Sequence, residues 1–415
     1  MKIYLDHNAT TPVLPEVAST MAEAQCDLRG NPSSPHQEGA RARAALEVAR
    51  AQVAALVGAR PTEVVFTSGA TESNATVVQS IFPAEARLSA GAENTHIAIG
   101  ATDHASIMDP VARLEKSGLQ VGTFGVDAKG DLAEDEIQRI LRSETALCCL
   151  LWANNETGAI HPIAGLTQAI RSSSGKEAPW IHVDAVQALT TQKIDFAESG
   201  VDSLSLSAHK MGGPKGVGAL IVKDGRTLTP LICGGPQERG LRAGTENVAG
   251  ILGLGEACRL ARERREERAQ KWGALRDLLW DRIQAGVSAV RLNSTLATGL
   301  CNTLNVGFQG VDGRVLVEAL DLEGVCVSSG AACSSGSLEP SHVLTAMGRS
   351  ASEARSAVRF SLGEGVSQDQ IEELGKSLPD IVSRVRASSV EGNVQAVEHR
   401  QRVFVLAAQS VVEGN

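Results

Sequence analysis

Short β-like runs alternate with longer helix-like stretches from about residue 16 to about residue 260, and this alternation limits the fold more than any other feature of the chain. Strands that alternate with helices pair mainly in parallel, and the helices cover both faces of the sheet. The pattern therefore predicts an α/β fold. The clearest strand candidates are residues 64–67, 96–99, 120–124, 147–152, 180–183, 203–206 and 218–222.

The chain has 415 residues, more than one hydrophobic core usually serves, so we expect two domains. A long helical stretch at about 249–286 could carry the chain out of the first domain. We predict a large domain at 16–260 and a small domain formed by 1–15 together with 261–415. Three elements would belong to the small domain: two strands, at 303–308 and 357–362, and a loop at about 326–340.

The charge of the chain argues against nucleic acid as a direct partner. The formal net charge is -9, and the 39 basic residues are spread along the sequence instead of forming one block. The one dense charge run, Arg259 to Arg268, mixes both signs at helical spacing, which is typical of a solvated helix face. Neither a secretion signal nor a membrane-spanning segment is recognisable, so we expect a cytoplasmic protein.

The eight cysteines show no repeated short spacing, so they predict neither a disulfide framework nor a zinc site, and no other metal is expected. Cys148 and Cys149 lie in an apolar run that is typical of a buried strand. Cys333 is different, because it lies in a run of serine, glycine and alanine, 328–337, whose side chains are too small to enclose a thiol in a core. We interpret Cys333 as a functional residue.

Lys210 is the second candidate for chemistry. It follows an apolar strand, in the segment Ser207-Ala208-His209-Lys210, and leads into a turn rich in glycine and proline. Lysines that form a Schiff base with a cofactor occur in such places. A thiol together with an imine-forming lysine indicates sulfur chemistry on pyridoxal 5'-phosphate (PLP).

Two further segments fit this cofactor. Residues 68–74 follow a strand and open a helix, so the backbone amides and the Thr71 hydroxyl could bind a phosphate, although Gly and Thr are also common as caps in such turns. Asp184 directly follows an apolar run, where a charge is costly without a cationic partner such as a protonated pyridine nitrogen. The alternative role for Asp184 is a helix N-cap.

His104 and the segment 154–158 also follow predicted strands. An imidazole at this position could stack on a cofactor ring and move protons, whereas a single histidine is more often structural. The segment 154–158, which contains Asn155, has an equally good interpretation as a plain turn.

In this order, the segments resemble the class V aminotransferase group of fold-type I PLP enzymes and, within it, the cysteine desulfurases of the NifS/IscS kind. The likeness runs from Tyr4 to about Gly363 and also includes residues 30–36 and 238–247. The cysteine loop resembles the long version found in the first of the two desulfurase classes. Ala208 stands where many relatives have glycine, and the resemblance does not extend to the tail beyond about Arg386.

The resemblance implies a role for each matching residue. Cys333 would be the nucleophile, Lys210 would carry the cofactor in a Schiff base, and Arg359 would bind the substrate carboxylate through a bidentate fork. The remaining residues would surround the cofactor: Ala70, Thr71, Ser207 and His209 at the phosphate, Asp184 at the pyridine nitrogen, Gln187 at the ring hydroxyl oxygen, Asn155 beside cofactor and substrate, His104 against the ring, and Thr245 at the phosphate of the neighbouring subunit in a homodimer.

The reaction implied by the resemblance converts L-cysteine to L-alanine, with Lys210 as the base, a persulfide on Cys333, and an acceptor protein for the sulfur. Two related activities stay open, an aminotransferase and a selenocysteine lyase. A third alternative, a sulfur-relay scaffold without cofactor chemistry, is disfavoured by the presence of Lys210, Asp184 and His104. The sequence does not choose among iron–sulfur cluster assembly, tRNA thiolation, DNA phosphorothioation and thiocofactor synthesis.

Overall fold

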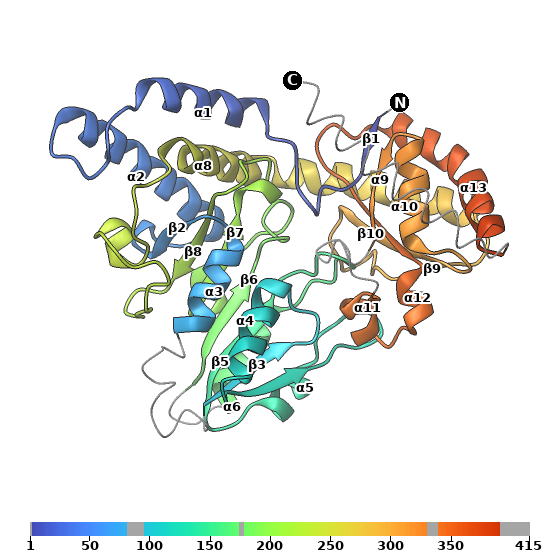
Figure 1. The fold of residues 1–415 in the computed structure, drawn as a ribbon, viewed down its shortest axis with the longest axis horizontal. Helices are drawn as coiled ribbons and strands as arrows, with labels where there is room; N and C mark the ends of the chain where they lie inside the picture. The colour runs from blue at the N-terminus through green and yellow to red at the C-terminus, as the bar shows by residue number, and fades with distance from the viewer. Residues whose placement is uncertain (1, 81–94, 174–177, 330–338, 391–415) are drawn as a thin grey trace.

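The computed structural model describes residues 2–80, 95–173, 178–329 and 339–390 (Figure 1). Its main sheet confirms the predicted α/β class: all neighbouring strands are parallel except β8, which runs antiparallel to β2 and β7. Each predicted strand of this sheet is present, with ends shifted by two residues at most. The order across the sheet is β2 (Val64–Thr67), β8 (Gly218–Val222), β7 (Ser203–Ser207), β6 (Trp180–Asp184), β5 (Thr145–Leu151), β3 (His96–Gly100) and β4 (Gln120–Phe124).

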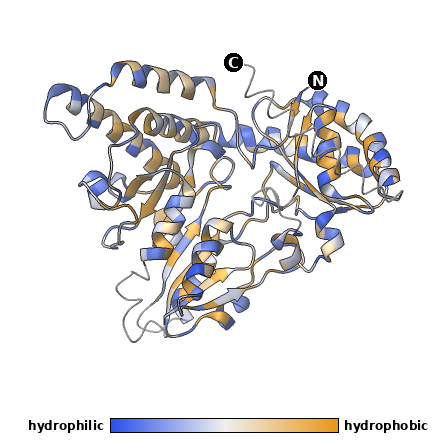
Figure 2. Cartoon of the chain, viewed as in Figure 1, coloured by the Kyte–Doolittle hydropathy of each residue, from blue (hydrophilic) through white to orange (hydrophobic). Residues whose placement is uncertain are grey.

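Helices cover both faces of the main sheet, because successive strand residues point to opposite sides. Val64 and Phe66 of β2 belong to one core and Val65 to the other. The central strands are hydrophobic in Figure 2, as burial on both faces requires. The core on one face is completed by α1 (Pro15–Asp27), α2 (Gln37–Val57), α5 (Glu134–Ile140), α6 (Ile163–Ser173), α7 (Phe196–Ser199) and α8 (Val248–Glu263), and the core on the other by α3 (Ala70–Ser80) and α4 (Ala105–Glu115).

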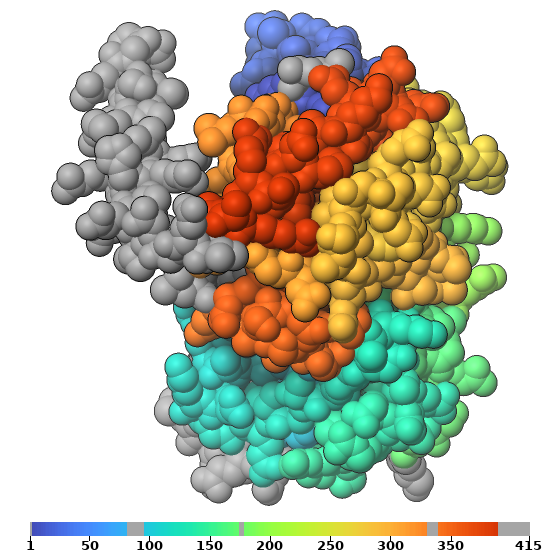
Figure 3. Space-filling model, turned by 90° about the vertical axis from the view of Figure 1, so that its right-hand side faces the viewer, coloured from blue at the N-terminus to red at the C-terminus, as the bar shows by residue number. Residues whose placement is uncertain are grey.

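A second, antiparallel sheet has its own core. Figure 3 shows two of its covering helices, α9 and α13, side by side on the outside of the molecule. This arrangement is compatible with the proposed large and small domains, whose boundaries stay a prediction. The strands, in spatial order, are β12 (Ser328–Ser329), β13 (Ala357–Ser361), β10 (Thr303–Phe308) and β9 (Val290–Leu292), and the helices of this core are α9 (Arg265–Gly286), α10 (Gly313–Leu322) and α13 (Gln368–Val390).

Shorter elements lie outside these two sheets. The amino-terminal strand β1 (Ile3–Tyr4) pairs in parallel with β11 (Val325–Cys326) as a separate two-stranded sheet, and a parallel bridge between Asp6 and Ser361 connects the start of the chain to the second sheet. The remaining elements are α11 (His342–Ala346), α12 (Ala351–Arg355) and the short 3-10 helices η1 (Pro61–Glu63), η4 (Ala208–Lys210) and η5 (Gln237–Gly240).

The predicted helical stretch at 249–286 consists of two helices, α8 and α9, which meet at Arg264. The interpretation of the charge run as a solvated face is wrong at one residue. Arg268 is 4% exposed, donates from Nε to Glu364 Oε1 at 2.9 Å and lies over the Trp272 ring. It is buried because α9 packs against the second sheet, a long-range contact that the local charge pattern does not reveal.

Cys148 and Cys149 are buried in β5 as predicted, and burial raises the pKa of both thiols. The seven cysteines within the described ranges form no disulfide with one another, and no cluster of three or more metal-binding side chains occurs among the described residues. Among the helices of the described ranges, none is both long enough and apolar enough to cross a membrane.

Candidate active site

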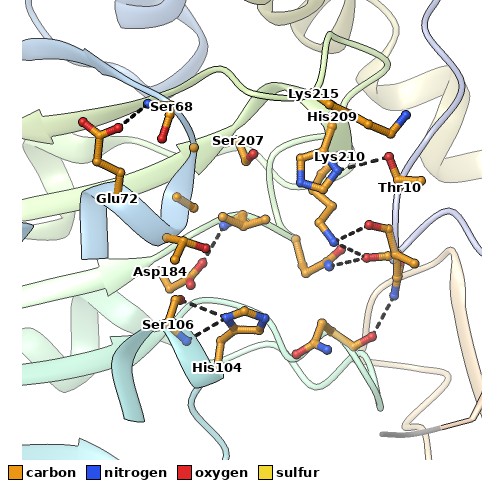
Figure 4. A pocket seen from close by; sticks show the side chains of 18 of the residues that line it. Thr10, Ser68, Glu72, His104, Ser106, Asp184, Ser207, His209, Lys210 and Lys215 are labelled. Atoms are coloured by element: carbon orange, nitrogen blue, oxygen red, sulfur yellow. Dashed lines mark hydrogen bonds between the residues drawn. The ribbon is translucent and has the colours of Figure 1, made fainter. Parts of the chain in front are cut away.

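A cavity of about 540 Å³ opens beyond the carboxyl ends of β5, β6 and β7, where open α/β sheets bind ligands (Figure 4). Residues of both sheets and of the amino-terminal segment line it. Ten residues predicted from the sequence lie in this lining: Ala70, Thr71, His104, Asn155, Asp184, Gln187, Ser207, His209, Lys210 and Arg359.

Lys210 ends η4, which begins directly after β7. Its ammonium group donates to the carbonyl oxygens of Asn8 at 2.5 Å and Ala9 at 2.8 Å. Gln187 also donates to the Asn8 carbonyl, at 3.0 Å. The amino-terminal segment therefore covers one side of the lysine, a contact that the sequence reasoning did not include.

The turn before α3 forms one end of the cavity, together with the end of β7. Gly69 has φ of 156°, and a Cβ at Gly218 would lie 2.6 Å from the Gly69 Cα, so both positions depend on glycine. The first residues of α3, Ala70 and Thr71, line the cavity beside Ser207 and His209. Amides at a helix start together with hydroxyl and imidazole groups are a donor set that fits a phosphate.

His209 is neutral near pH 7. Burial and, to a smaller extent, the charges of Lys210 and Lys215 together lower its pKa to about 4. Its Nδ1 lies 3.1 Å from Thr10 Oγ1. A neutral ring here can act as donor or acceptor without adding charge.

Asp184 is the last residue of β6 and is 6% exposed. Its Oδ1 accepts from the Val186 amide at 3.0 Å, and its Oδ2 accepts from Asn74 Nδ2 at 2.9 Å. A turn, and not a helix, follows Asp184, so it is not a helix N-cap. A buried carboxylate that lines the cavity and has no cationic partner among these contacts fits a protonated pyridine nitrogen, and the donor set at the other end fits the phosphate of the same cofactor.

His104 has both of the roles considered for it. As the N-cap of α4, its Nδ1 accepts from the Ser106 amide at 3.1 Å and lies 2.8 Å from Ser106 Oγ. The same ring lines the cavity, and Figure 4 shows it opposite Lys210. The cap fixes the position of the ring relative to the cavity.

Arg359 comes from β13 of the second sheet and is 2% exposed. It donates from Nη1 to the Asn155 carbonyl and from Nη2 to Asp6 Oδ1, both at 2.9 Å. Asp6 was not singled out from the sequence, although it lies in the amino-terminal motif that carries the family resemblance. This ion pair orients the guanidinium at the edge of the cavity.

Two buried acids lie where the large sheet meets the segment 339–346. Ser341 donates from Oγ to Glu156 Oε2 at 2.6 Å, and His342 Nε2 donates to the Asp103 carbonyl oxygen at 3.1 Å. Burial raises the pKa of Glu156 to about 7 and that of Asp103 to about 8. These contacts attach the start of α11 to the wall of the cavity.

Two predicted residues are not part of this cavity. Cys333 lies outside the described residues. Thr245 is exposed in the segment between η5 and α8 and does not line the cavity of its own chain.

Comparison with known proteins shows the family of this chain. The class-V aminotransferase family model matches residues 3–374. The chain is 40% identical to a cysteine desulfurase of Trichormus azollae over 394 residues, which cover 95% of this chain and 96% of the relative. A solved NifS-like protein superposes with a TM-score of 0.85 at 33% identity, covering 92% of this chain and 100% of that structure. The structure of SspA in complex with cysteine has a TM-score of 0.76 at 34% identity and covers 87% and 99%.

Proposed function

The chain belongs to the class-V aminotransferases and, among them, to the cysteine desulfurases, and we propose that it converts L-cysteine to L-alanine, holds the sulfur as a persulfide on Cys333 and passes it to an acceptor protein. Its cofactor is PLP. One observation carries the proposal: Lys210, Asp184 and Arg359 line a single cavity.

Four residues would hold the cofactor at its two ends. Thr71, Ser207 and His209 would bind the phosphate beside the first amides of α3, and Asp184 would pair with the pyridine nitrogen. When bound, PLP withdraws electrons from the α-carbon of the amino acid attached to it. Ala70 would add its amide at the phosphate, and Gln187, Asn155 and His104 would contact the ring.

The substrate would be oriented by Arg359, whose guanidinium binds the carboxylate of cysteine. Lys210 would take the α-proton and hold it at Nζ. The Cys333 thiolate would attack the substrate sulfur, so that an S–S bond forms, the Cβ–S bond breaks, and the electron pair stays on Cβ. Protonation of Cβ gives the methyl group of alanine, and Lys210 Nζ would return the α-proton to Cα to complete the product.

The proposal includes a homodimer in which Thr245 of the partner subunit completes the phosphate site. Thr245 is exposed and lies away from its own cavity. Leu231 and Ile232, two adjacent apolar side chains in the segment before η5, expose 37% and 41% of their surface, which a partner subunit could cover. A cytoplasmic location and an acceptor in iron–sulfur cluster assembly or in thiolation belong to the same proposal.

The test is to incubate PLP-loaded protein with L-cysteine and dithiothreitol and to quantify alanine and sulfide together. We expect equal amounts from the wild type and at least a ~100-fold loss of both in Cys333→Ala, because the nucleophile is gone. Cys26→Ala, which removes an exposed thiol on α1, is the matched control and should behave like the wild type.

Each contrary result has a definite meaning. Sulfide release by Cys333→Ala at the wild-type rate would remove Cys333 from the mechanism. No alanine from the wild type would favour an aminotransferase, which consumes a 2-oxo acid, or a lyase that acts on selenocysteine and spares cysteine.

A further inference from the structure

One carboxamide connects the two residues that face the cofactor from the large sheet. Asn74 on α3 is fully buried and donates from Nδ2 to Asp184 Oδ2 at 2.9 Å and to Ser106 Oγ at 2.8 Å. Its Oδ1 lies 2.9 Å from His182 Nε2. Ser106 in turn contacts His104. Asn74 therefore has a partner for both of its N–H groups and for its oxygen.

The direction of each hydrogen bond follows from the partners. A carboxylate can only accept, so the Asn74 nitrogen must face Asp184, and its oxygen must face His182. The oxygen can only accept, so His182 carries a proton on Nε2. Burial lowers the pKa of His182 to about 3, so the ring is neutral and its Nδ1 is an acceptor.

The rest of this branch agrees with that direction. Ser203 Oγ lies 2.8 Å from His182 Nδ1 and accepts from Trp180 Nε1 at 2.7 Å. Since the oxygen already receives the indole hydrogen, its own hydroxyl hydrogen is available to His182. The hydrogen bonds therefore all run in one direction: Trp180 donates to Ser203, Ser203 to His182, His182 to Asn74, and Asn74 to Asp184.

The second branch determines the proton on His104. Ser106 Oγ accepts one N–H of Asn74 and lies 2.8 Å from His104 Nδ1, and because that nitrogen also faces a backbone amide it must be an acceptor, so the hydroxyl donates to it. The Ser106 amide donates to the same nitrogen. Because Nδ1 accepts from both groups, the proton of the neutral His104 ring must be on Nε2.

We propose that Asn74 is a positioning residue that sets two groups at once: the Asp184 carboxylate directly, and the protonation of His104 through Ser106. Neutral His104 then offers a hydrogen-bond donor at Nε2 and no lone pair there, so Nε2 cannot take the α-proton, which leaves that proton to Lys210. The catalytic consequence depends on the proposed function, whereas the hydrogen-bond directions do not.

The first test is the ¹⁵N NMR spectrum of histidine-labelled protein without cofactor and after loading with PLP. The signals are assigned with His104→Gln and His182→Gln. We expect both rings in the form protonated on Nε2, without and with the cofactor. A proton on Nδ1 of either ring would overturn the proposal, and this result does not depend on any enzymatic activity.

The second test is Asn74→Asp, which keeps an acceptor for His182 but replaces both N–H donors. We expect the His182 signals to stay in place and the His104 Nδ1 signal to move. We also expect kcat to fall by about ten- to a hundredfold with a much smaller change in KM, because two hydrogen bonds at charged or catalytic groups are lost and a second carboxyl group lies against Asp184.

Ser205→Ala is the matched control. Ser205 is fully buried on β7 in register with Asp184, and its hydroxyl has no hydrogen-bond partner among the described residues. The proposal would be contradicted if Asn74→Asp and Ser205→Ala gave the same His104 signals and the same kcat. If Asn74→Asp does not fold, Ser106→Ala removes the hydroxyl step alone and should lower kcat by about threefold or more. An unchanged kcat would contradict the Ser106 branch.

Discussion

The two walls of the cavity are built in different ways. On the large-sheet wall, Asp184 and His104 are held by hydrogen bonds through Asn74 and Ser106. Asp184 ends β6, His104 and Ser106 lie at the start of α4, and Asn74 lies in α3, so all four belong to one sheet and the helices that cover it. On the other wall, Arg359 is held by Asp6, 353 residues away in the chain. The wall with Asp184, which we propose faces the cofactor, is therefore held within one sheet and its helices, whereas the wall with Arg359, which we propose faces the substrate, needs the two ends of the chain to meet.

The electrostatics of the walls differ as well. The Asp184 carboxylate is surrounded by neutral N–H donors, and its counter-charge would come from the cofactor. The Arg359 guanidinium already has a counter-charge in Asp6 and is almost fully buried. Removing one partner of a buried ion pair leaves the other charge unpaired, which is costly. Substitutions should therefore separate cofactor binding from substrate binding.

The largest effect is expected at Lys210, where the two walls meet. Lys210→Ala should lose the visible absorbance of the lysine–cofactor bond and should lower turnover by at least ~1000-fold, because the attachment point and the base are removed together. Spectra and alanine release after loading with PLP measure both effects. Lys223→Ala, at an exposed lysine after β8, is the control. A Lys210→Ala protein that kept the absorbance would disprove the assignment of the lysine.

Arg359→Lys should affect the substrate wall alone. Lysine keeps the charge but cannot form the bidentate fork, so we expect KM for L-cysteine to rise by about ten- to a hundredfold. The visible absorbance of the bound cofactor should be retained. Steady-state kinetics and a spectrum of the same sample separate the two walls. An unchanged KM would mean that another cation binds the carboxylate.

Asp6→Asn should give a smaller effect of the same kind. Asparagine can still accept from Arg359, but the buried guanidinium loses its counter-charge. We expect KM to rise by about threefold to tenfold and the free energy of unfolding to fall by about 2 kcal/mol, a value reduced because Asp6 is partly exposed. Denaturant unfolding and kinetics measure both. If KM does not change, Asp6 is not needed to orient Arg359.

Much of the large-sheet wall could be predicted from the sequence, because its signals are local. Strand ends are visible as apolar runs, and Lys210, Asp184 and His104 each follow one. The partners of these residues could not be predicted in the same way. Asn74 lies inside α3, where nothing in the local pattern indicates that its side chain points at Asp184 on β6.

The wall that contains Arg359 was predicted only through the family resemblance. Arg359 lies within an apolar strand, and its pairing with Asp6 depends on how β13 and the amino-terminal segment meet. The same limit explains Arg268, whose burial comes from contacts between α9 and the second sheet. Charges that are neutralised across the fold have no signature in a local window of sequence.

The smallest effect concerns the boundary between the walls, where Asp103 is buried beside the start of α11. Burial raises its folded-state pKa from 3.8 to about 8, so the folded protein keeps a proton that the unfolded chain releases. Its contribution to stability is complete below the unfolded pKa and is lost as the pH rises through the folded pKa. Over that range, the free energy of unfolding falls by at most about 1.4 kcal/mol per pH unit for one such group.

Asp103→Asn keeps an acceptor for the Gly100 amide and removes this titration. Thermal or denaturant unfolding between about pH 5 and about pH 7 should show a decline in stability for the wild type that is ~2 kcal/mol larger than for the variant. Glu156, whose pKa burial raises to about 7, still titrates in the variant, so the decline is reduced and not abolished. If the free energy of unfolding had the same pH dependence in both proteins, Asp103 would be ionised in the folded protein. The boundary would then hold a buried charge, as the wall with Arg359 does.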